Sequence, residues 1–319
     1  MVALYEWARV GPAICSLYVS PPVASKVCAP TGCHDAPNRR PTRQGSQELR
    51  TTIFALAAVA VIAGCGDGPE GSDPHPPNSM KTVVVTWIDD GDSLDATVEG
   101  ADLSIRLLGI NAPELGECFA DVSLDYLIEN VKAKEVGYVP FGTDQFGRTL
   151  AEIWVDGQLL NLELVARGLA VATTPDGLSA HGTDLLAAED AAYVRRLGLW
   201  AETACGASGT LPPIEFDWAS SQPNPPGPDS DDLDAEYVTI FNTGGASVDL
   251  SGWTLRDESS RNRLVFPSGL ILDAGSRLRI SSGCGEILSW CQDTPIWNNS
   301  GDLALLLDSK GRVIDRVRY

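Results

Sequence analysis

Three short stretches of the chain carry side chains that could act on a phosphate group. They span residues 89–93 (DDGDS), 106–114 (RLLGINAPE) and 144–151 (DQFGRTLA). Hard cations such as Ca²⁺ take oxygen ligands, and Asp92 directly follows a glycine turn from which a carboxylate can project. Arginine matches the geometry of phosphoryl oxygens and stays charged. These residue types suit the hydrolysis of a phosphodiester, in which negative charge builds up on the phosphoryl oxygens.

The surrounding pattern predicts a small barrel that would hold these stretches. Val- and Thr-rich runs predict strands at 82–88, 93–98, 103–110 and 147–155, with turns such as Glu99-Gly100 and Asp156-Gly157 between or after them. Apolar spacing of the helical type predicts helices at 121–134, 159–168 and 183–197. Strands first, with helices inserted and appended, predict a five-stranded Greek-key barrel of the OB-fold type over residues 81–205.

The three stretches resemble the staphylococcal-nuclease family in both order and spacing. The segment Arg195-Arg196-Leu197-Gly198-Leu199-Trp200 is similar to the end of that domain, so the resemblance covers residues 81 to about 205. It implies a Ca²⁺-dependent nuclease that hydrolyses the phosphodiester bonds of DNA or RNA.

The resemblance also assigns roles to individual residues. It implies that Asp92, Asn111 and the backbone carbonyl of Ala112 are the calcium ligands. It further implies that Arg106 and Arg148 stabilise the charge of the phosphoryl group.

Glu114 and Asn111 lie in the second stretch. By the same resemblance, Glu114 is the candidate that orients or deprotonates the attacking water. Many relatives have Asp where this chain has Asn111, so calcium should bind more weakly here. Clear counterparts of the base-stacking aromatics are absent, and Phe146 remains as an apolar wall near the phosphate site. The alternative is a non-catalytic surface-binding or scaffold protein with a degenerate nuclease domain.

The pattern of residues 206–319 predicts a second domain made of many short strands. Short runs from Ile214–Trp218 to Val313–Val317, with turns at regular spacing, favour a C-terminal immunoglobulin-like β-sandwich. This region resembles the lamin-tail domain family, at 236–238 (EYV), 242–244 (NTG), 248–257 (VDLSGWTLRD) and 297–302 (WNNSGD). The resemblance implies an accessory role: binding a cell-surface polymer, or spacing. The whole chain is thus expected to be mainly β with helices.

Charge argues against diffuse binding of nucleic acid. The formal net charge is −20, and residues 65–319 carry 17 basic and 40 acidic side chains, a charge of −23. Non-specific nucleic-acid binding depends on Lys and Arg that release counterions. A cation and a few arginines must therefore create one local positive site.

The N-terminal residues contain an export signal. Arg50 precedes an apolar run at 51–64 that is too short to span a bilayer. Ile62-Ala63-Gly64-Cys65 resembles the bacterial lipobox, which implies that Cys65 is lipidated. We therefore predict a leader at 1–64 and a Pro/Gly-rich tether at 65–80. We interpret the early part of the leader as untranslated sequence, included because the start codon was assigned too far upstream. The expected product is a lipoprotein anchored to the membrane at the cell surface or in the periplasm, or else a secreted protein with an ordinary signal peptide.

The chain has eight cysteines, and none of them forms a C-x-x-C pair. Cys118 and Cys205 flank the first domain, and Cys284 and Cys291 lie close together in the second. In an oxidising compartment these four predict the disulfides Cys118–Cys205 and Cys284–Cys291; free buried thiols are the alternative. The sequence carries no clear signal for an oligomer.

Overall fold

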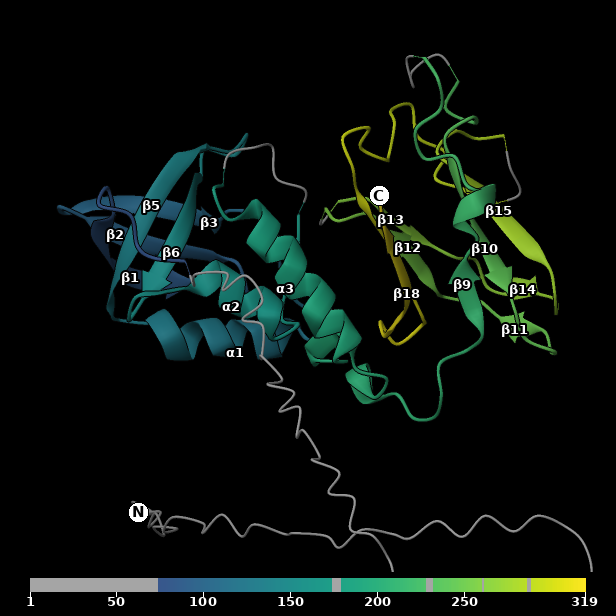
Figure 1. The fold of residues 1–319 in the computed structure, drawn as a ribbon, viewed down its shortest axis with the longest axis horizontal. Coiled ribbons are helices and arrows are strands. Elements are labelled where there is room, and N and C mark those ends of the chain that lie inside the picture. The colour runs from purple at the N-terminus through teal and green to yellow at the C-terminus, as the bar shows by residue number, and fades with distance from the viewer. Residues whose placement is uncertain (1–73, 174–178, 228–231, 260, 286–287) are drawn as a thin grey trace, which may run out of the picture. The chain divides into compact units, whose positions relative to one another are not determined.

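The computed structural model describes residues 74–173, 179–227, 232–259, 261–285 and 288–319. The predicted leader, Cys65 and the first part of the tether lie outside these residues. Contacts group Asp67–Tyr319 into one compact unit, shown as a ribbon in Figure 1. No helix within the described ranges is both long and apolar enough to cross a membrane.

A closed barrel forms the first part of this unit, which we call the barrel module (residues 81–205). Its sheet has the strand order β3-β2-β1-β5-β6-β7, and a parallel pairing of β3 with β6 closes five strands into the barrel. This is the OB-type fold predicted from the sequence. Its strands are β1 (Lys81–Ile88), β2 (Ser93–Val98), β3 (Ala101–Leu107), β4 (Ile110–Asn111), β5 (Glu135–Thr143), β6 (Thr149–Val155), β7 (Gln158–Leu159) and β8 (Val171–Ala172).

The barrel strands alternate between core and solvent as the period of two requires. In β1, Val83 and Val85 point inward and are 1% exposed, whereas the residues between and beside them are exposed. Strand β5 was not predicted. It contains Gly137, Pro140 and Gly142, residue types that are depleted in strands, and its register shifts between Pro140 and Gly142.

Three helices accompany the barrel where the sequence predicted them, each slightly shorter than expected. They are α1 (Ala120–Val131), α2 (Leu160–Ala166) and α3 (Gly182–Val194), followed by two short 3₁₀ turns, Gly198–Trp200 and Ala204–Gly206. Asn161 of α2 is fully buried and ties this helix to the barrel: Ile153 donates its N–H to the Asn161 Oδ1 atom, and Nδ2 donates to the carbonyl of Leu108. The helix thereby fixes the chain just before the candidate ligand Asn111.

The remaining strands form the sandwich module (residues 206–319). A sheet with the order β16-β15-β10-β9 and one with the order β13-β12-β17-β18 enclose a core that includes Ile240, Leu255 and Trp297, with a small β11-β14 ladder beside them. The strands are β9 (Ile214–Phe216), β10 (Tyr237–Asn242), β11 (Val248–Asp249), β12 (Thr254–Arg256), β13 (Arg263–Val265), β14 (Ile271–Leu272), β15 (Arg277–Ser281), β16 (Leu288–Ser289), β17 (Leu303–Leu307) and β18 (Val313–Arg318). The sandwich-type fold was predicted; the short strands β11 and β16 were not. The boundary between residues 205 and 206 stays a prediction.

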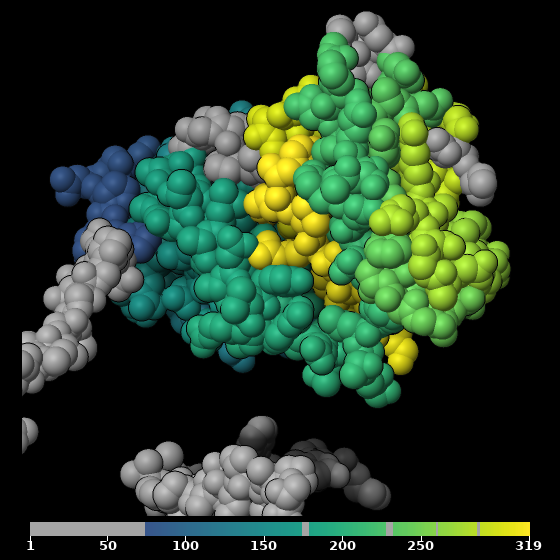
Figure 2. Space-filling view, turned by 45° about the vertical axis from the view of Figure 1, so that its right-hand side comes forward, coloured from purple at the N-terminus to yellow at the C-terminus, as the bar shows by residue number. Residues whose placement is uncertain are grey.

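The two modules share an apolar cluster. Val171, Ala192 and Trp200 of the barrel module pack with Leu303 and Leu305 of the sandwich module. Figure 2 shows the C-terminal residues in yellow between the teal barrel module and the green part of the sandwich module. Burial of this cluster stabilises the contact between the modules because it removes apolar surface from water.

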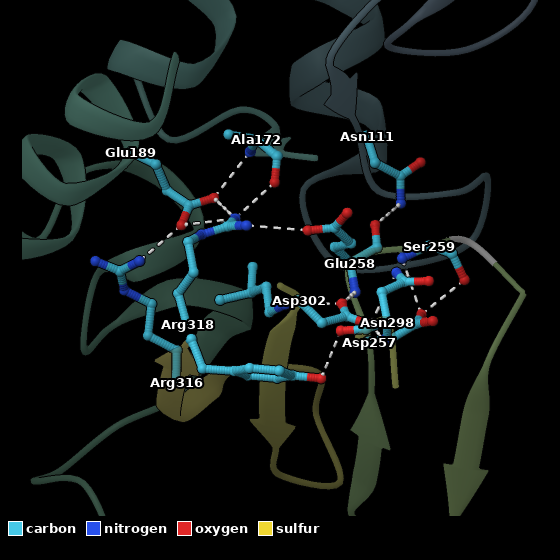
Figure 3. A network of polar contacts seen from close by, with 12 residues as sticks. Asn111, Ala172, Glu189, Asp257, Glu258, Ser259, Asn298, Asp302, Arg316 and Arg318 are labelled. Carbon is cyan, nitrogen blue, oxygen red and sulfur yellow. Dashed lines mark hydrogen bonds and ion pairs between the residues drawn. The ribbon is translucent and has the colours of Figure 1, made fainter. Parts of the chain in front are cut away.

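A buried ion network reinforces that contact (Figure 3). Glu189 of α3 is fully buried and accepts hydrogen bonds from Arg316 (2.6 Å), Arg318 (3.1 Å) and the N–H of Ala172 (2.8 Å). Arg318 also donates to the Ala172 carbonyl (2.7 Å) and to the Glu258 carboxylate (2.9 Å). Every one of these contacts from Arg316 and Arg318 to α3 and β8 joins one module to the other.

Two disulfides occur among the residues that the structure describes, and both pairings are the predicted ones. Cys118–Cys205 joins residues on either side of the three helices of the barrel module, and Cys284–Cys291 closes a short loop of the sandwich module. The Cα–Cα distances are 5.4 Å for Cys118–Cys205 and 4.2 Å for Cys284–Cys291. The first lies within the usual range of about 4.4–6.8 Å for disulfides, and the second lies just below it.

We predict that Glu189→Ala destabilises the whole unit. Removing one partner of a buried ion pair leaves uncompensated charge and typically costs about 3–5 kcal/mol; the remaining partners of Arg316 and Arg318, Asp190 and Glu258, place the expectation near the lower value. Urea unfolding measures the change. The matched control is Glu163→Ala, whose partner Arg167 is more than half exposed and whose loss should cost less than about 1 kcal/mol. Equal stability of the two variants would contradict the prediction.

Candidate functional site

The first predicted stretch is a tight turn that can be built only around glycine. A Cβ atom on Gly91 would lie 2.6 Å from the Cβ of Ser123 in α1 and 2.8 Å from the Cβ of Ala112. The N–H of Asp92 donates to the Oδ1 atom of Asp90 (2.9 Å), which fixes the turn from within. The turn therefore lies directly against the segment that follows β4, and it carries Asp92 to that segment.

The Asp92 carboxylate is buried, with 3% of the residue exposed. Its Oδ2 atom accepts the N–H of Ala112 (2.6 Å). Its Oδ1 atom forms an ion pair with Arg106 Nη1 and accepts the hydroxyl of Ser93 (3.1 Å). A buried carboxylate needs such partners, so Asp92 draws the first two predicted stretches together.

Arg106 extends the cluster from β3 to β4. Its Nη2 atom donates to the Oδ1 atom of Asn111 (2.8 Å) and to the carbonyl of Ile110 (3.2 Å). Burial lowers the pKa of Arg106 to about 10, which leaves the guanidinium charged at neutral pH. Arg106 is therefore a permanent positive charge that touches two of the three predicted calcium ligands.

Arg148 brings in the third predicted stretch. Its Nη1 atom donates to the hydroxyl of Ser93 (3.2 Å), and its Nε atom donates to Asp144 (2.8 Å). Slight burial opposes ionisation of Asp144, but the hydrogen bonds from Arg148 outweigh it and hold the pKa of Asp144 below its ordinary value. Both predicted arginines, which come from two later stretches of the sequence, thus converge on the Asp92-Ser93 pair.

Glu114 lies at the edge of this cluster and is partly exposed. Its backbone N–H donates to Glu117 (2.9 Å). Its carboxylate attracts Arg106 of the barrel module and Arg256 and Arg263 of the sandwich module. Within the described ranges this carboxylate has no hydrogen-bond or ion-pair partner, which leaves it able to bind a water molecule or a ligand.

Asn111 has a partner that sequence reasoning did not foresee. It is 1% exposed, pairs with Val171 of β8, and donates from Nδ2 to the backbone carbonyl of Glu258 in the sandwich module (3.1 Å; Figure 3). An Asp at this position could accept from Arg106 but could not donate to a carbonyl. The amide that departs from the family pattern is therefore the group that joins the site to the second module.

A cavity of about 350 Å³ lies beside Asn111 between the two modules. Its wall includes Glu117, which forms ion pairs with Arg256 (3.7 Å) and Arg263 across the module contact. Burial lowers the pKa of Arg256. The sandwich module thus places two arginines next to the Glu114 segment, and no sequence motif had indicated this.

The predicted calcium ligands fit the ion in chemical type. Asp92, Asn111 and the Ala112 carbonyl are all oxygen donors, which is what Ca²⁺ requires. They supply one negative charge, and the oxygens of Asp92 and Asn111 accept from Arg106, Ser93 and Ala112. No group of three or more His, Cys, Asp or Glu side chains able to hold a metal occurs in the described part of the chain. A cation would have to compete with Arg106 for these oxygens.

Fold and site together define a class: an OB-type barrel with two arginines and several acidic residues gathered at its strand ends, followed by an immunoglobulin-like sandwich. Residues 104–202 match the family model "Staphylococcal nuclease homologue", and residues 220–319 match "Lamin Tail Domain". The chain belongs to the staphylococcal nuclease family and carries a lamin tail domain after the nuclease-like one.

Individual relatives agree with this assignment. The chain is 34% identical over 122 residues to an "Uncharacterized endonuclease" of Haemophilus influenzae, a match that covers 38% of this chain and 67% of the relative. It is 30% identical over 127 residues to "Micrococcal nuclease" of Shigella flexneri, covering 37% and 72%. It is 24% identical over 164 residues to "Thermonuclease" of Staphylococcus intermedius, covering 47% and 96%.

We predict opposite effects of Asn111→Asp on calcium binding and on stability. The added charge should lower the calcium concentration needed for half-saturation by roughly tenfold, which corresponds to about 1.4 kcal/mol. In calcium-free buffer the carboxylate would face the Glu258 carbonyl, so the melting temperature should fall. Isothermal titration and thermal unfolding measure the two effects. A variant that is more stable without calcium, or that binds calcium less tightly, would contradict the geometry described for Asn111.

A second prediction concerns pH. Asp302 is buried; it accepts N–H groups of Leu303 (2.7 Å), Glu258 (3.3 Å) and Asn298 (3.0 Å) (Figure 3). Burial, helped by the nearby Asp257 and Glu258 charges, nevertheless raises the pKa of Asp302 to about 7. Between pH 4 and 7 the folded chain then holds a proton that the unfolded chain has lost. The stabilisation is complete below about pH 4 and is lost as pH rises through 7.

Urea unfolding from pH 5 to 8 tests this. We expect stability to fall with a slope of up to about 1.4 kcal/mol per pH unit for one proton. Asp302→Asn should remove that component of the slope, whereas the matched variant Asp293→Asn, at an exposed position of the same module, should keep it. Identical slopes in the wild type and Asp302→Asn would show that Asp302 is ionised throughout this range.

Proposed function

We propose that this chain is a Ca²⁺-dependent nuclease that hydrolyses phosphodiester bonds of DNA and RNA. The observation that carries the proposal is the convergence of Arg106 and Arg148, from two separate stretches of the sequence, on the Asp92-Ser93 pair. Membership of the staphylococcal nuclease family supports it.

The two arginines would stabilise the transition state. As water attacks the phosphorus atom, negative charge grows on the non-bridging oxygens, and preorganised guanidinium groups lower the energy of that charge. Arg106 is held by Asn111 and Asp92, and Arg148 is held by Asp144 and Ser93. Because both are fixed before substrate binds, little reorganisation is needed during the reaction.

Glu114 would orient the attacking water or accept its proton. Its carboxylate is partly exposed, lies in the field of Arg106, and has no hydrogen-bond partner within the described ranges. In the step itself the water oxygen bonds to phosphorus, one bridging P–O bond breaks, and the leaving oxygen takes up a proton. The water proton passes to Glu114 or, through water, to solvent.

Asp92, Asn111 and the carbonyl of Ala112 would hold the calcium ion. When bound, Ca²⁺ supplies positive charge next to the phosphoryl oxygens, which the strongly acidic chain otherwise lacks. Because Arg106 already contacts Asp92 and Asn111, we expect the site to need more calcium than one with two carboxylate ligands.

We further propose that the protein works outside the cytoplasm. Two disulfides fit an oxidising compartment. The proposed route is export through the leader at 1–64 with lipidation of Cys65, so that the tether at 65–80 holds the nuclease at a membrane surface. The lamin tail domain would have an accessory role, with a cell-surface polymer as its proposed ligand.

The alternative is a protein that binds or scaffolds without cutting. It is favoured by one observation: the oxygens of Asp92 already have internal donors, so a cation must displace Arg106. The two functions differ in one assay. Purified protein is incubated with denatured DNA, either with Ca²⁺ or with a chelator. Calcium-dependent loss of long DNA supports the nuclease; uncut DNA at every calcium concentration supports the alternative.

We predict that Arg148→Ala lowers kcat about 100-fold or more, the usual cost of removing one preorganised donor to a developing anion. The matched control is Arg167→Ala, an exposed arginine of the same module paired with Glu163, which should keep wild-type activity. Initial rates on denatured DNA at saturating calcium provide the comparison. Wild-type activity in Arg148→Ala would remove this arginine from the mechanism.

A further inference from the structure

Resting on the proposed nuclease function, we propose that Arg261 of the lamin tail domain belongs to the substrate-binding site. It would contact a backbone phosphate of the nucleic-acid strand next to the position held by Arg106 and Arg148. Both modules would then contribute to the site: the second module would bind a backbone phosphate of the strand that the first module cuts.

Contacts on both sides hold the segment that carries Arg261 against the nuclease module. On one side the carbonyl of Glu258 accepts the hydrogen bond from Asn111 (3.1 Å). On the other side Arg263 forms an ion pair with Glu117. Since both anchors are residues of the candidate site or its immediate border, Arg261 lies between two fixed points beside that site.

The segment is also organised internally. Asp257 accepts the N–H of Ser259 (2.8 Å) and the side-chain amide of Asn262 (2.6 Å). The hydroxyl of Ser259 in turn accepts the N–H of Arg261 (3.2 Å). These bonds fix the backbone of Arg261, so that a ligand would not have to order it on binding.

The Arg261 side chain reaches the third stretch of the site. Its guanidinium carbon lies 5.0 Å from the ring centroid of Phe146, and the guanidinium carbon of Arg148 lies 5.5 Å from the same centroid. With the amide oxygen of Gln145 turned toward Arg261, that oxygen is 3.0 Å from Nη1. The two arginines therefore contact the same exposed phenylalanine. Their guanidinium carbons can be no farther apart than the sum of these two distances. Each strand of a DNA duplex carries a charge about every 3.4 Å along the helix axis, so the two arginines are close enough to contact phosphates a few nucleotides apart on one strand.

Charge explains what Arg261 adds. Arg106 is paired with Asp92 and Arg148 with Asp144. Arg261 is exposed, and no carboxylate pairs with it in the part of the chain that the structure describes. In a chain of net charge −20 it is a positive charge at the site that remains available to a phosphate.

Binding and cleavage of a fluorescent single-stranded oligonucleotide, both with the full chain in calcium, test the proposal. We expect Arg261→Ala to raise KM and the dissociation constant roughly tenfold at low salt and to change kcat by less than about twofold. The slope of log K against log salt should become shallower by about 0.7, the value for one contact to a single strand. Arg261→Lys keeps the charge and should restore the slope, which a merely structural role would not require.

Arg195→Ala is the matched control, because Arg195 is an exposed arginine that follows α3, and among the described residues it has no hydrogen bond or ion pair to the site. It removes the same charge and should leave KM and the salt slope unchanged. If the wild type cleaves and Arg261→Ala binds, cleaves and responds to salt as the wild type does, the role of Arg261 is wrong while the nuclease function stands. If the wild type fails to cleave at any calcium concentration, the proposed function is wrong whatever Arg261 does. Equal weakening by Arg195→Ala would show a general charge effect and would also overturn the proposal.

Discussion

The buried carboxylate of Asp92 is the constraint on which the site depends. A charge that is 3% exposed must be paired, and its partners are Arg106, Ser93 and the N–H of Ala112. These partners lie on β2, on β3 and directly after β4, so the need to neutralise one carboxylate brings three strand ends together. Arg148 joins through the same Ser93 hydroxyl. The contacts that stabilise this arrangement are also the ones with which a cation must compete.

The sandwich module supplies partners to residues in and beside the candidate site of the barrel module. Through Glu258 it accepts the amide hydrogen of Asn111, and through Arg256 and Arg263 it contacts Glu117. An asparagine in place of a charged ligand is a weakness when the nuclease module is considered alone. In the presence of the sandwich module it is the residue type that can satisfy an arginine on one side and a carbonyl on the other. In the proposed calcium site, the ligand Asn111 is thus also the residue that contacts the second module.

Strand and helix patterns in the sequence were enough to predict the barrel and the sandwich. The placement of four cysteines predicted both disulfides, and the resemblance to the staphylococcal-nuclease family predicted the grouping of Asp92, Arg106 and Arg148. Each of these depends on residues with strong local preferences or on motifs of fixed spacing. Strand β5 escaped prediction because its glycines and proline contradict strand propensity and the barrel closure overrides them. The contact of Asn111 with Glu258 and the approach of Arg261 to Gln145 could not be predicted, since they depend on how two separately patterned modules pack, with sequence separations above 100 residues.

The shared apolar cluster has a practical consequence for anyone who isolates the nuclease-like part. A recombinant fragment ending near Cys205 would leave Val171, Leu199 and Trp200 without the Leu303 and Leu305 side chains that cover them. The buried carboxylate of Glu189 would also lose its ion-pair partners Arg316 and Arg318. Such a fragment is expected to associate with itself through this exposed apolar surface, and its measured kinetics would not represent those of the whole chain. Excising the barrel module alone is therefore poorly suited to this chain.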